Sequence, residues 1–529
     1  MKLLFQRNVL KVAIAFLCGI LFLASCSKPP KVETLIPKDA PFVVSVNISK
    51  IADKGSLKNI KQLSTYRSVE KELPSEGKFV LGALIDNPEE CGINFEEDIV
   101  AYPLGMDFST FVVASVLSDD DKFKDFAVGI FKSVFGKNAS PEEKDDYYVL
   151  KDKEFTIAWD EYRVFVVVGK RNESVAGEMM KLEEENSMAS NSKFTEFWNK
   201  RGDISVYADV DNIMDNAMVK RAVKELDRYN VPQKFISDLS HGSLFANLNF
   251  EKGNITLHVE RNGIGNSIIS SVFDQKFNES LFRYVPENPM SAATLSVNVS
   301  NIMNIVDEVD SRLLSDNISG YSFREIAKSF KGSIVTAVTG IERDRWGDMQ
   351  PTSVVVADIN NPDLIRRLLS NMSRYRTDNG YYCIDSYYVA VKNDAVIVSN
   401  SLSELNRTSS NGLRNIASKA KTGGYMYCNL DMNDMPGSVR DYLGNDFISL
   451  WNKLFESFEV KTSGSKAVDI VLNIPSKGEN TLAYLINYFD KNGENLVGAI
   501  NNVQRRAYDN YDRYYDHYPE SYSEEYADF

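Results

Sequence analysis

The stretch FVVSVNIS, residues 42–49, sets the pattern from which we predict the fold. Its apolar residues Val44, Val46 and Ile48 alternate with polar ones, and a period of two is typical of a half-buried β-strand. Ser49 is of a residue type that often caps a helix, and the segment after it is polar and compatible with a helix. The stretch therefore predicts a strand that ends where a helix begins.

The same unit occurs three more times along the chain. The later copies are Val206–Val210 followed by Asp211, Leu295–Val299 followed by Ser300, and Met426–Leu430 followed by Asp431. We predict that Ser49, Asp211, Ser300 and Asp431 cap helices, and that Asn47, Asp209, Asn298 and Asn429 point outward from the strands. The favoured explanation for these outward residues is that a short polar side chain helps to end a strand and start a helix. A shared ligand-binding face is the alternative.

The flanking segments place these units in a longer repeat of about half the chain. Ile36, Pro37 and Asp39 precede the first unit much as Val285, Pro286 and Asn288 precede the third. Strand-like segments then follow in the same order. They are at 110–116, 156–159, 163–168, 244–250 and 254–260 in the first half and at 353–359, 388–391, 395–399, 458–460 and 467–474 in the second. Short turns between strands imply antiparallel pairing, so we predict an α+β fold of two tandem similar halves, each a mainly antiparallel sheet with helices on one face.

The repeat and the composition divide the chain into five parts. We expect a signal peptide in residues 1–25, a lipidated tether in 26–35, the first half in 36–284, the second half in 285–507 and a tail in 508–529. The second half is expected to end in a helix that breaks at Gly493. The tail holds seven tyrosines and seven acidic residues without an apolar period, so we predict that it is disordered.

Composition and charge indicate a globular protein that stays in water. The chain has 529 residues, of which 43% are hydrophobic and 25% charged, and that length exceeds what a single core usually organises. The formal net charge is −14, and loss of Lys2, Arg7 and Lys11 with the signal peptide lowers it to −17. A surface this acidic repels phosphate backbones, which argues against nucleic acid as a partner.

Leu23, Ala24, Ser25 and Cys26 resemble the lipoprotein box of bacterial lipoproteins. Basic residues and then the uncharged apolar stretch 12–24 precede them, and this stretch is shorter than the roughly 20 residues of a membrane-spanning helix. The resemblance implies cleavage before Cys26 and its acylation, so the acyl chains would hold the protein at a membrane. No acidic cluster follows Cys26, which favours the periplasmic side of the outer membrane and leaves surface exposure open.

The usual catalytic and metal-binding patterns are missing from the sequence. His241, His258 and His517 have no ligand spacing for zinc, and no Gly-x-Ser-x-Gly nucleophile elbow is present. Gly263 and Gly265 lack the third glycine and the strand context of a phosphate loop, and fit a turn better. We predict no catalytic residue, no metal site and no cofactor.

Runs of acidic residues have simpler explanations than chemistry. Asp119–Asp121 precede a helix, where negative charge favours the helix N-terminus, and Glu183–Glu185 fit a solvated helix end. Two sets resemble fragments of a calcium loop without its remaining ligands: Asp490, Asn492 and Gly493, and Asp431, Asn433 and Asp434.

Three cysteines remain besides Cys26 after processing, namely Cys91, Cys383 and Cys428. Three thiols do not form a disulfide framework, although a bridge between Cys383 and Cys428 stays open. We expect cysteines in strand-like runs to pack as small apolar residues.

The lipoprotein box, the opening at Ile36–Ala40 and the tandem halves together resemble a family of large Gram-negative envelope lipoproteins with no assigned function. The resemblance supports location and architecture and supplies no catalytic residues. Our leading hypothesis is a non-enzymatic, lipid-anchored envelope protein whose halves form a binding or scaffolding surface for another envelope protein or a glycan. The alternatives are a hydrolase of envelope glycan or peptide, acting through carboxylates across the seam between halves, and a carrier of an apolar ligand.

Overall fold

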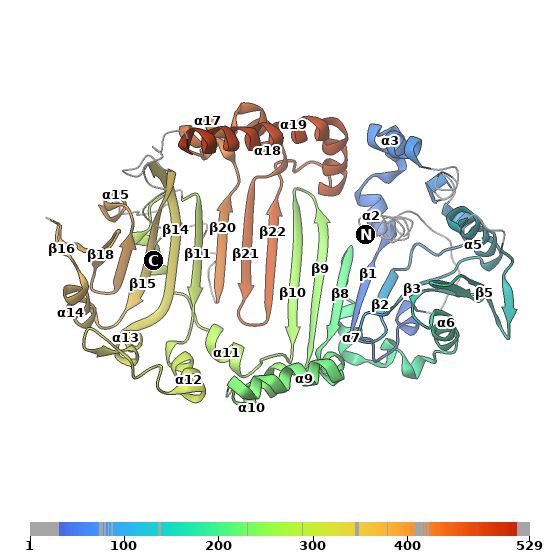
Figure 1. Ribbon diagram of the computed structural model, residues 1–529, viewed down its shortest axis with the longest axis horizontal. Helices are drawn as coiled ribbons and strands as arrows, with labels where there is room; N and C mark the ends of the chain where they lie inside the picture. The colour runs from blue at the N-terminus through green and yellow to red at the C-terminus, as the bar shows by residue number, and fades with distance from the viewer. Residues whose placement is uncertain are drawn as a thin grey trace, which may run out of the picture.

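A computed structural model describes residues 31–515, apart from 74–77, 79–80, 83, 86–87, 136–138, 230, 288, 344–348, 378, 407–415, 417–418 and 420–422. The predicted signal peptide, Cys26 and the last part of the predicted tail, with His517, lie outside the described residues. Figure 1 shows a wide sheet whose strands run between two rows of helices.

Twenty strands form one continuous antiparallel sheet, so the predicted α+β class is confirmed. From one edge to the centre, the strands are β4 (Glu142–Lys144), β5 (Tyr147–Lys151), β6 (Phe155–Trp159), β7 (Arg163–Gly169), β3 (Thr110–Val116), β2 (Ile99–Pro103), β1 (Phe42–Val46), β8 (Ile204–Asp209), β9 (Ser243–Glu251) and β10 (Asn254–Asn262). The sequence patterns did not predict β2.

From the centre to the other edge, the strands come from the second part of the chain. They are β22 (Ala467–Asn473), β21 (Ser457–Ser463), β20 (Gly424–Asn429), β11 (Ser291–Ser296), β14 (Phe330–Arg343), β15 (Met349–Ile359), β19 (Ala395–Ser399), β18 (Tyr387–Val391), β17 (Tyr382–Ile384) and β16 (Tyr375–Arg376). A separate two-stranded sheet joins β12 (Asn317–Ile318) to β13 (Tyr321–Ser322).

Strands β10 and β22 join the two parts of the sheet at its centre. Residues 254–260 pair in register with residues 473–467, which makes an antiparallel ladder like those within each part. On either side of this ladder lie first β9 and β21 and then β8 and β20, so the two sides are matched near the seam. The sequence predicts one sheet in each half, whereas pairing between β10 and β22 makes a single sheet.

The helices lie at the strand ends and over the outer parts of the sheet (Figure 1). Those before β11 are α2 (Ile48–Lys54), α3 (Ser64–Glu72), α5 (Asp120–Phe135), α6 (Asn172–Met180), α7 (Ser192–Trp198), α8 (Val210–Asp215), α9 (Ala217–Glu225), α10 (Gln233–Leu239) and α11 (Ile268–Phe273). Those after it are α12 (Val299–Asp310), α13 (Phe323–Lys328), α14 (Pro362–Met372), α15 (Leu402–Asn406), α17 (Gly437–Leu443), α18 (Asn445–Leu454) and α19 (Thr481–Tyr515). Short 3-10 helices are η1 (Val32–Leu35), η2 (Leu57–Gln62), η3 (Pro88–Cys91), η4 (Glu184–Asn186), η5 (Met188–Ser190), η6 (Leu226–Tyr229), η7 (Glu279–Tyr284) and η8 (Met432–Asp434).

In the first part of the sheet, helices pack on both faces rather than on the one face that we predicted. Val175 and Ala176 of α6 join a buried core with Phe165 of β7. Phe123 of α5 joins a second core with Val164, the neighbour of Phe165 and therefore on the other face of the strand. Because β7 carries large apolar side chains on both faces, a helix has to pack against each face.

The structure corrects two predictions near the chain ends. Val32 and Leu35 are fully buried in the core of the first part, so residues 32–35 belong to the folded body and not to a tether. Helix α19 is continuous from Thr481 to Tyr515, so the predicted break at Gly493 is wrong and the start of the predicted tail is helical.

Neither Cys383 nor Cys428 takes part in a disulfide, which rules out the bridge that the sequence left open. Cys383 lies on β17 and Cys428 on β20, with β18, β19, β15, β14 and β11 between these strands. At about 4.8 Å per strand, their separation far exceeds the reach of a disulfide.

Candidate functional site

The four recurrent polar residues are structural rather than ligand-binding. The side chains of Asn47, Asp209 and Asn298 each accept a hydrogen bond from a backbone N–H three residues later, at 2.8, 3.1 and 3.0 Å. These residues are the helix N-caps, so Ser49, Asp211 and Ser300 are not, whereas Asp431 caps η8 as predicted. Asn47 and Asp209 are also buried, so they do not point into solvent.

A buried carboxylate that sequence reasoning missed holds the first unit in place. Asp98 is fully buried and accepts hydrogen bonds from Ser45 Oγ, from Asn47 Nδ2 at 2.7 Å and from Arg201 Nε at 2.8 Å. Every one of these partners is a donor, and of the four side chains only that of Arg201 is partly exposed. Asp98 therefore anchors β1 to the segment before β2 and does not form a site.

Both described histidines lie beside carboxylates. Nδ1 of His258 on β10 lies 2.6 Å from Asp469 Oδ1 on β22, and Nε2 lies 3.6 Å from Glu260 Oε2. His241 lies at the surface, 2.7 Å from Asp211. Among the described residues, no group of three or more His, Cys, Asp or Glu side chains could hold a metal ion.

The acidic runs also have structural roles. Asp119 Oδ1 accepts from the backbone N–H of Lys122 at 3.0 Å, at the start of α5, as predicted for a charge at a helix N-terminus. Asp434 accepts from Asn429 Nδ2 at 2.6 Å. Asp490 and Gly493 lie within helix α19, where a calcium loop has no room.

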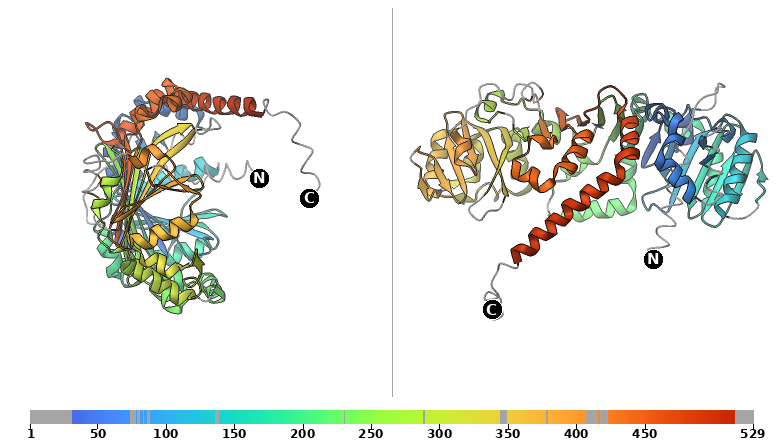
Figure 2. Two further views of the ribbon diagram at one scale, coloured as in Figure 1. Left: turned by 90° about the vertical axis from the view of Figure 1, so that its left-hand side faces the viewer. Right: turned by 90° about the horizontal axis from the view of Figure 1, so that it is seen from above.

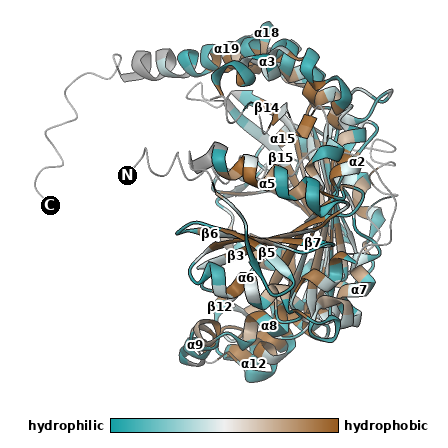
Figure 3. Cartoon of the chain, turned by 90° about the vertical axis from the view of Figure 1, so that its right-hand side faces the viewer, coloured by the Kyte–Doolittle hydropathy of each residue, from teal (hydrophilic) through white to brown (hydrophobic). Residues whose placement is uncertain are grey.

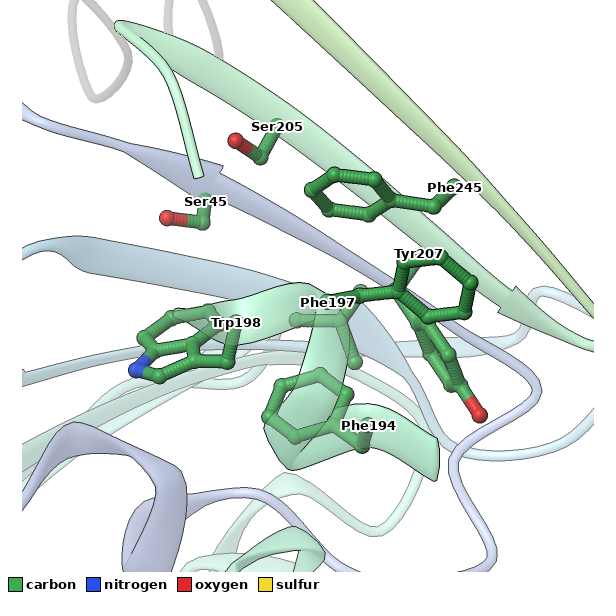
Figure 4. A pocket seen from close by; sticks show the side chains of 8 residues that line it. Ser45, Phe194, Phe197, Trp198, Ser205, Tyr207 and Phe245 are labelled. Carbon is green, nitrogen blue, oxygen red and sulfur yellow. The ribbon is translucent and has the colours of Figure 1, made fainter. Parts of the chain in front are cut away.

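An interior cavity between the sheet and α7 is too small for a ligand. It has a volume of about 10 Å³, about enough for one water molecule, and Figure 4 shows the aromatic rings around it. Phe197 stacks on Phe245 at 4.9 Å between centroids, and Phe194 meets Tyr207 edge-on at 5.0 Å. These contacts make a packed core, so a carrier function cannot use this cavity.

The centre of the sheet is apolar on one face and polar on the other. Because directly paired residues lie on the same face, the ladders give a continuous row of Leu248, Leu257, Ile470, Val460, Met426 and Ala293 from β9 to β11. A parallel row consists of Ala246, Val259, Val468, Thr462, Gly424 and Leu295. We call this side the apolar sheet face.

The opposite side carries the charged and hydrogen-bonding residues. The neighbours of the first row are Asn247, His258, Asp469, Lys461 and Tyr425, which pair with each other in the same way. We call this side the polar sheet face. The polar sheet face can meet water, whereas the apolar sheet face has the composition of a core.

At the centre of the sheet, the described chain leaves the apolar sheet face without a full layer over it, whereas α5 and α14 pack against its outer parts. Every residue of β22 and all but the last of β10 are only partly buried, so neither face of these strands has a full layer over it. Seven aliphatic or phenylalanine residues on the strands are 37–41% exposed, and the registers put all seven on the apolar sheet face: Phe111, Val168, Val206, Leu244, Leu295, Val355 and Met426.

The face extends into a cluster of phenylalanine rings at one end of β1. Phe108 lies 5.7 Å from Phe42 and 6.1 Å from Phe111 between ring centroids, and it is 46% exposed. Its φ of 52° is in the left-handed region, which is a strained conformation for a bulky residue. The segment between β2 and β3 therefore holds the exposed ring of Phe108 beside the apolar sheet face.

The outline of the molecule leaves this face accessible. Viewed along its long axis, the chain is C-shaped, with the sheet as the back of the C and helices at both ends of the strands (Figures 2 and 3). Helix α5, which packs with Val46 and Val166 of the apolar sheet face, lies on the inner side of the C in Figure 3. The apolar sheet face therefore lines the open side.

The sequence did predict alternating strands but not which side would be buried. We expected Val206 and Ala208 to face the core, whereas Ser205, Tyr207 and Asp209 are buried and Val206 is exposed. The hydrogen bond between Ser205 Oγ and Asn247 Oδ1, at 2.5 Å, satisfies buried polar groups that a sequence pattern assigns to the surface.

Comparison with known proteins places the chain in a family. Residues 32–440 match the family described as Domain of unknown function (DUF4836), which is more than half of the chain. The protein belongs to this family. The match includes β1 to β20 and ends before β21, β22 and most of the helices that follow β20.

Other comparisons add no function. No curated protein matches the chain. Among solved structures, crystal form I of TP0453 matches with 9% sequence identity over 46% of this chain and 81% of that chain. Its TM-score of 0.25 does not indicate a shared fold. No helix among the described residues is long and apolar enough to cross a membrane.

Proposed function

We propose that this member of the family is a non-enzymatic, lipid-anchored protein of the bacterial cell envelope that binds another envelope component through its apolar sheet face. The observation that carries the proposal is the uncovered row from Leu248 to Ala293, backed by a polar face on the same strands. Contiguous exposed apolar patches on a globular protein mark binding surfaces.

Location and anchoring are parts of the proposal that come from the sequence. The lipoprotein box at Leu23–Cys26 supports acylation of Cys26 and attachment to the outer membrane. The matched strand order on either side of β10 and β22 supports an internal duplication, which would create one wide face from two similar halves. Mass spectrometry of the mature N-terminus should find acyl groups on Cys26, and an unmodified cysteine would contradict the anchor.

Crosslinking in intact cells tests the binding surface. A photoreactive residue in place of Met426, on the apolar sheet face, should give crosslinked products, because that side chain is exposed and apolar. The matched control is the same residue in place of Lys461, an exposed position on the polar sheet face of the adjacent strand. Equal products at both positions, or none at either, would contradict binding through the apolar sheet face.

A further inference from the structure

The proposed function does not say which envelope component binds the apolar sheet face. The side chains of the face indicate what kind of molecule it is. We infer that the face binds the acyl chains of membrane lipids. The inference rests on the proposed function, since it names the ligand of the same surface, and it follows from three features of the face.

The first feature is that the face lacks hydrogen-bonding groups. Across β9, β10, β22 and β21, its side chains are aliphatic or phenylalanine except for Thr462 and Arg261. The Arg261 guanidinium already donates to the carbonyl oxygens of Ser465 and Ile264 and, at 3.2 Å, to Ser270 Oγ. Protein interfaces are rich in tyrosine, tryptophan and arginine and carry hydrogen bonds, whereas acyl chains need none.

The second feature is that the backbone beneath the face is already paired. From β5 to β17 each strand has a neighbour on both sides, so an added peptide strand can pair with β4 or β16 at the sheet edges and not at the centre. An occupant of the centre must therefore contact side chains alone. This requirement excludes recognition of a peptide by strand addition on the apolar sheet face.

The third feature is the shape around the face. Helices stand at both ends of the strands and reach past the sheet on its open side (Figure 2, left), so a wide flat surface would meet these helices before it met the apolar sheet face. The row from β9 to β11 crosses five strand spacings, or roughly 24 Å. One leaflet of a bilayer has about 15 Å of hydrocarbon, so the row is long enough for an acyl chain laid across the strands.

Noncovalent lipid on the purified full-length chain provides the test. Solvent extraction removes noncovalent lipid and leaves covalent acyl groups on the protein, so lipid on Cys26 does not interfere. We expect at least one phospholipid or fatty acid per wild-type chain by mass spectrometry. Met426→Glu with Leu295→Glu should lower this amount at least tenfold, because both residues are exposed on the apolar sheet face and tolerate a charge without unfolding.

The control is Thr256→Glu, which adds a negative charge to the polar sheet face of β10 and should leave the lipid content unchanged. Added cis-parinaric acid should rebind to delipidated wild type and to this control but not to the double variant. The same lipid content in all three proteins, or none in wild type, would overturn the inference. A protein crosslinked at Met426 without lipid would overturn it as well, while leaving the proposed binding function in place.

Discussion

At the scale of single residues, helix caps explain most of the recurrent polar side chains, which is the explanation that the sequence favoured. Asn47, Asp209 and Asn298 end their strands by accepting the first free N–H groups of the helices. Asp490 does the same between distant segments: it accepts from the Thr65 N–H at 2.7 Å and the Ser64 hydroxyl at 2.9 Å. A residue of α19 therefore caps α3.

This cap predicts a pH-dependent contact between α3 and α19. The hydrogen bond from the Thr65 backbone lowers the pKa of Asp490 to about 2. Since the carboxyl has an ordinary pKa of about 3.9 when unfolded, the cap stabilises the fold fully above that value and is lost as the pH falls towards 2. Asp490→Ala should cost about 1 kcal/mol at pH 7, the usual cost of a lost cap.

Hydrogen exchange of the α3 amides measures this effect. The variant should exchange faster than wild type at pH 7, with the difference shrinking between about pH 4 and pH 2. Asp490→Asn is the control, because its amide oxygen can still accept but does not titrate. A difference that is constant over this pH range would show that the carboxylate charge has no part in the cap.

At the scale of elements, α19 departs from its predicted form at one glycine. Gly493 costs helix stability and so predicts a break, but the helix runs through it without interruption. A Cβ at Gly493 would meet no atom within 4 Å. Gly493→Ala should therefore stabilise the protein by about 0.5–1 kcal/mol and raise its Tm in a thermal scan.

At Gly332 on β14, in contrast to Gly493, an added methyl group should destabilise the protein. Its φ is 111°, and a Cβ there would lie 1.9 Å from the Val297 carbonyl oxygen. Gly332→Ala should lower the Tm, because the strand would have to shift to admit the methyl group. If both variants lowered the Tm equally, Gly493 would be needed for more than its place in a helix.

These elements also mark what the sequence could and could not predict. Alternation found β1, β8 and β11, and residue types found the caps to within two positions, because both depend on neighbours along the chain. Which side of β8 is buried depends on Asn247, which lies 42 residues from Ser205 in the chain. Its hydrogen bond with Ser205 satisfies the serine hydroxyl, so the serine can be buried. Contacts of that range leave no local pattern, so the apolar sheet face was missed.

At the scale of the whole molecule, the ladder between β10 and β22 joins the two parts of the chain into one sheet. Without it, each part would end in a bare edge strand, and the apolar sheet face would be split in two. The proposed lipid-binding face therefore has its full width only because β10 and β22 are paired. Asn480 Nδ2 adds a hydrogen bond to the Phe250 carbonyl at 2.8 Å beside it.

A cysteine pair across the seam tests this arrangement. Thr256 and Val471 are paired directly, both on the polar sheet face. The Arg261 N–H donates to Lys466 on the β22 side, and since directions alternate along a strand, the Thr256 N–H points to β9 instead. The pair is thus a non-hydrogen-bonded one, whose Cα atoms are about 4.5 Å apart and whose side chains are close enough to bridge.

Thr256→Cys with Val471→Cys should form a disulfide under mild oxidation, seen as a faster band in non-reducing electrophoresis and as a linked peptide in mass spectrometry. The control, Thr256→Cys with Glu459→Cys, places the second thiol one strand further away on β21, where direct bridging is out of reach. A bridge in the control but not in the test pair would mean that β10 does not neighbour β22. The apolar rows would then not cross the seam, and a single wide binding face could not exist.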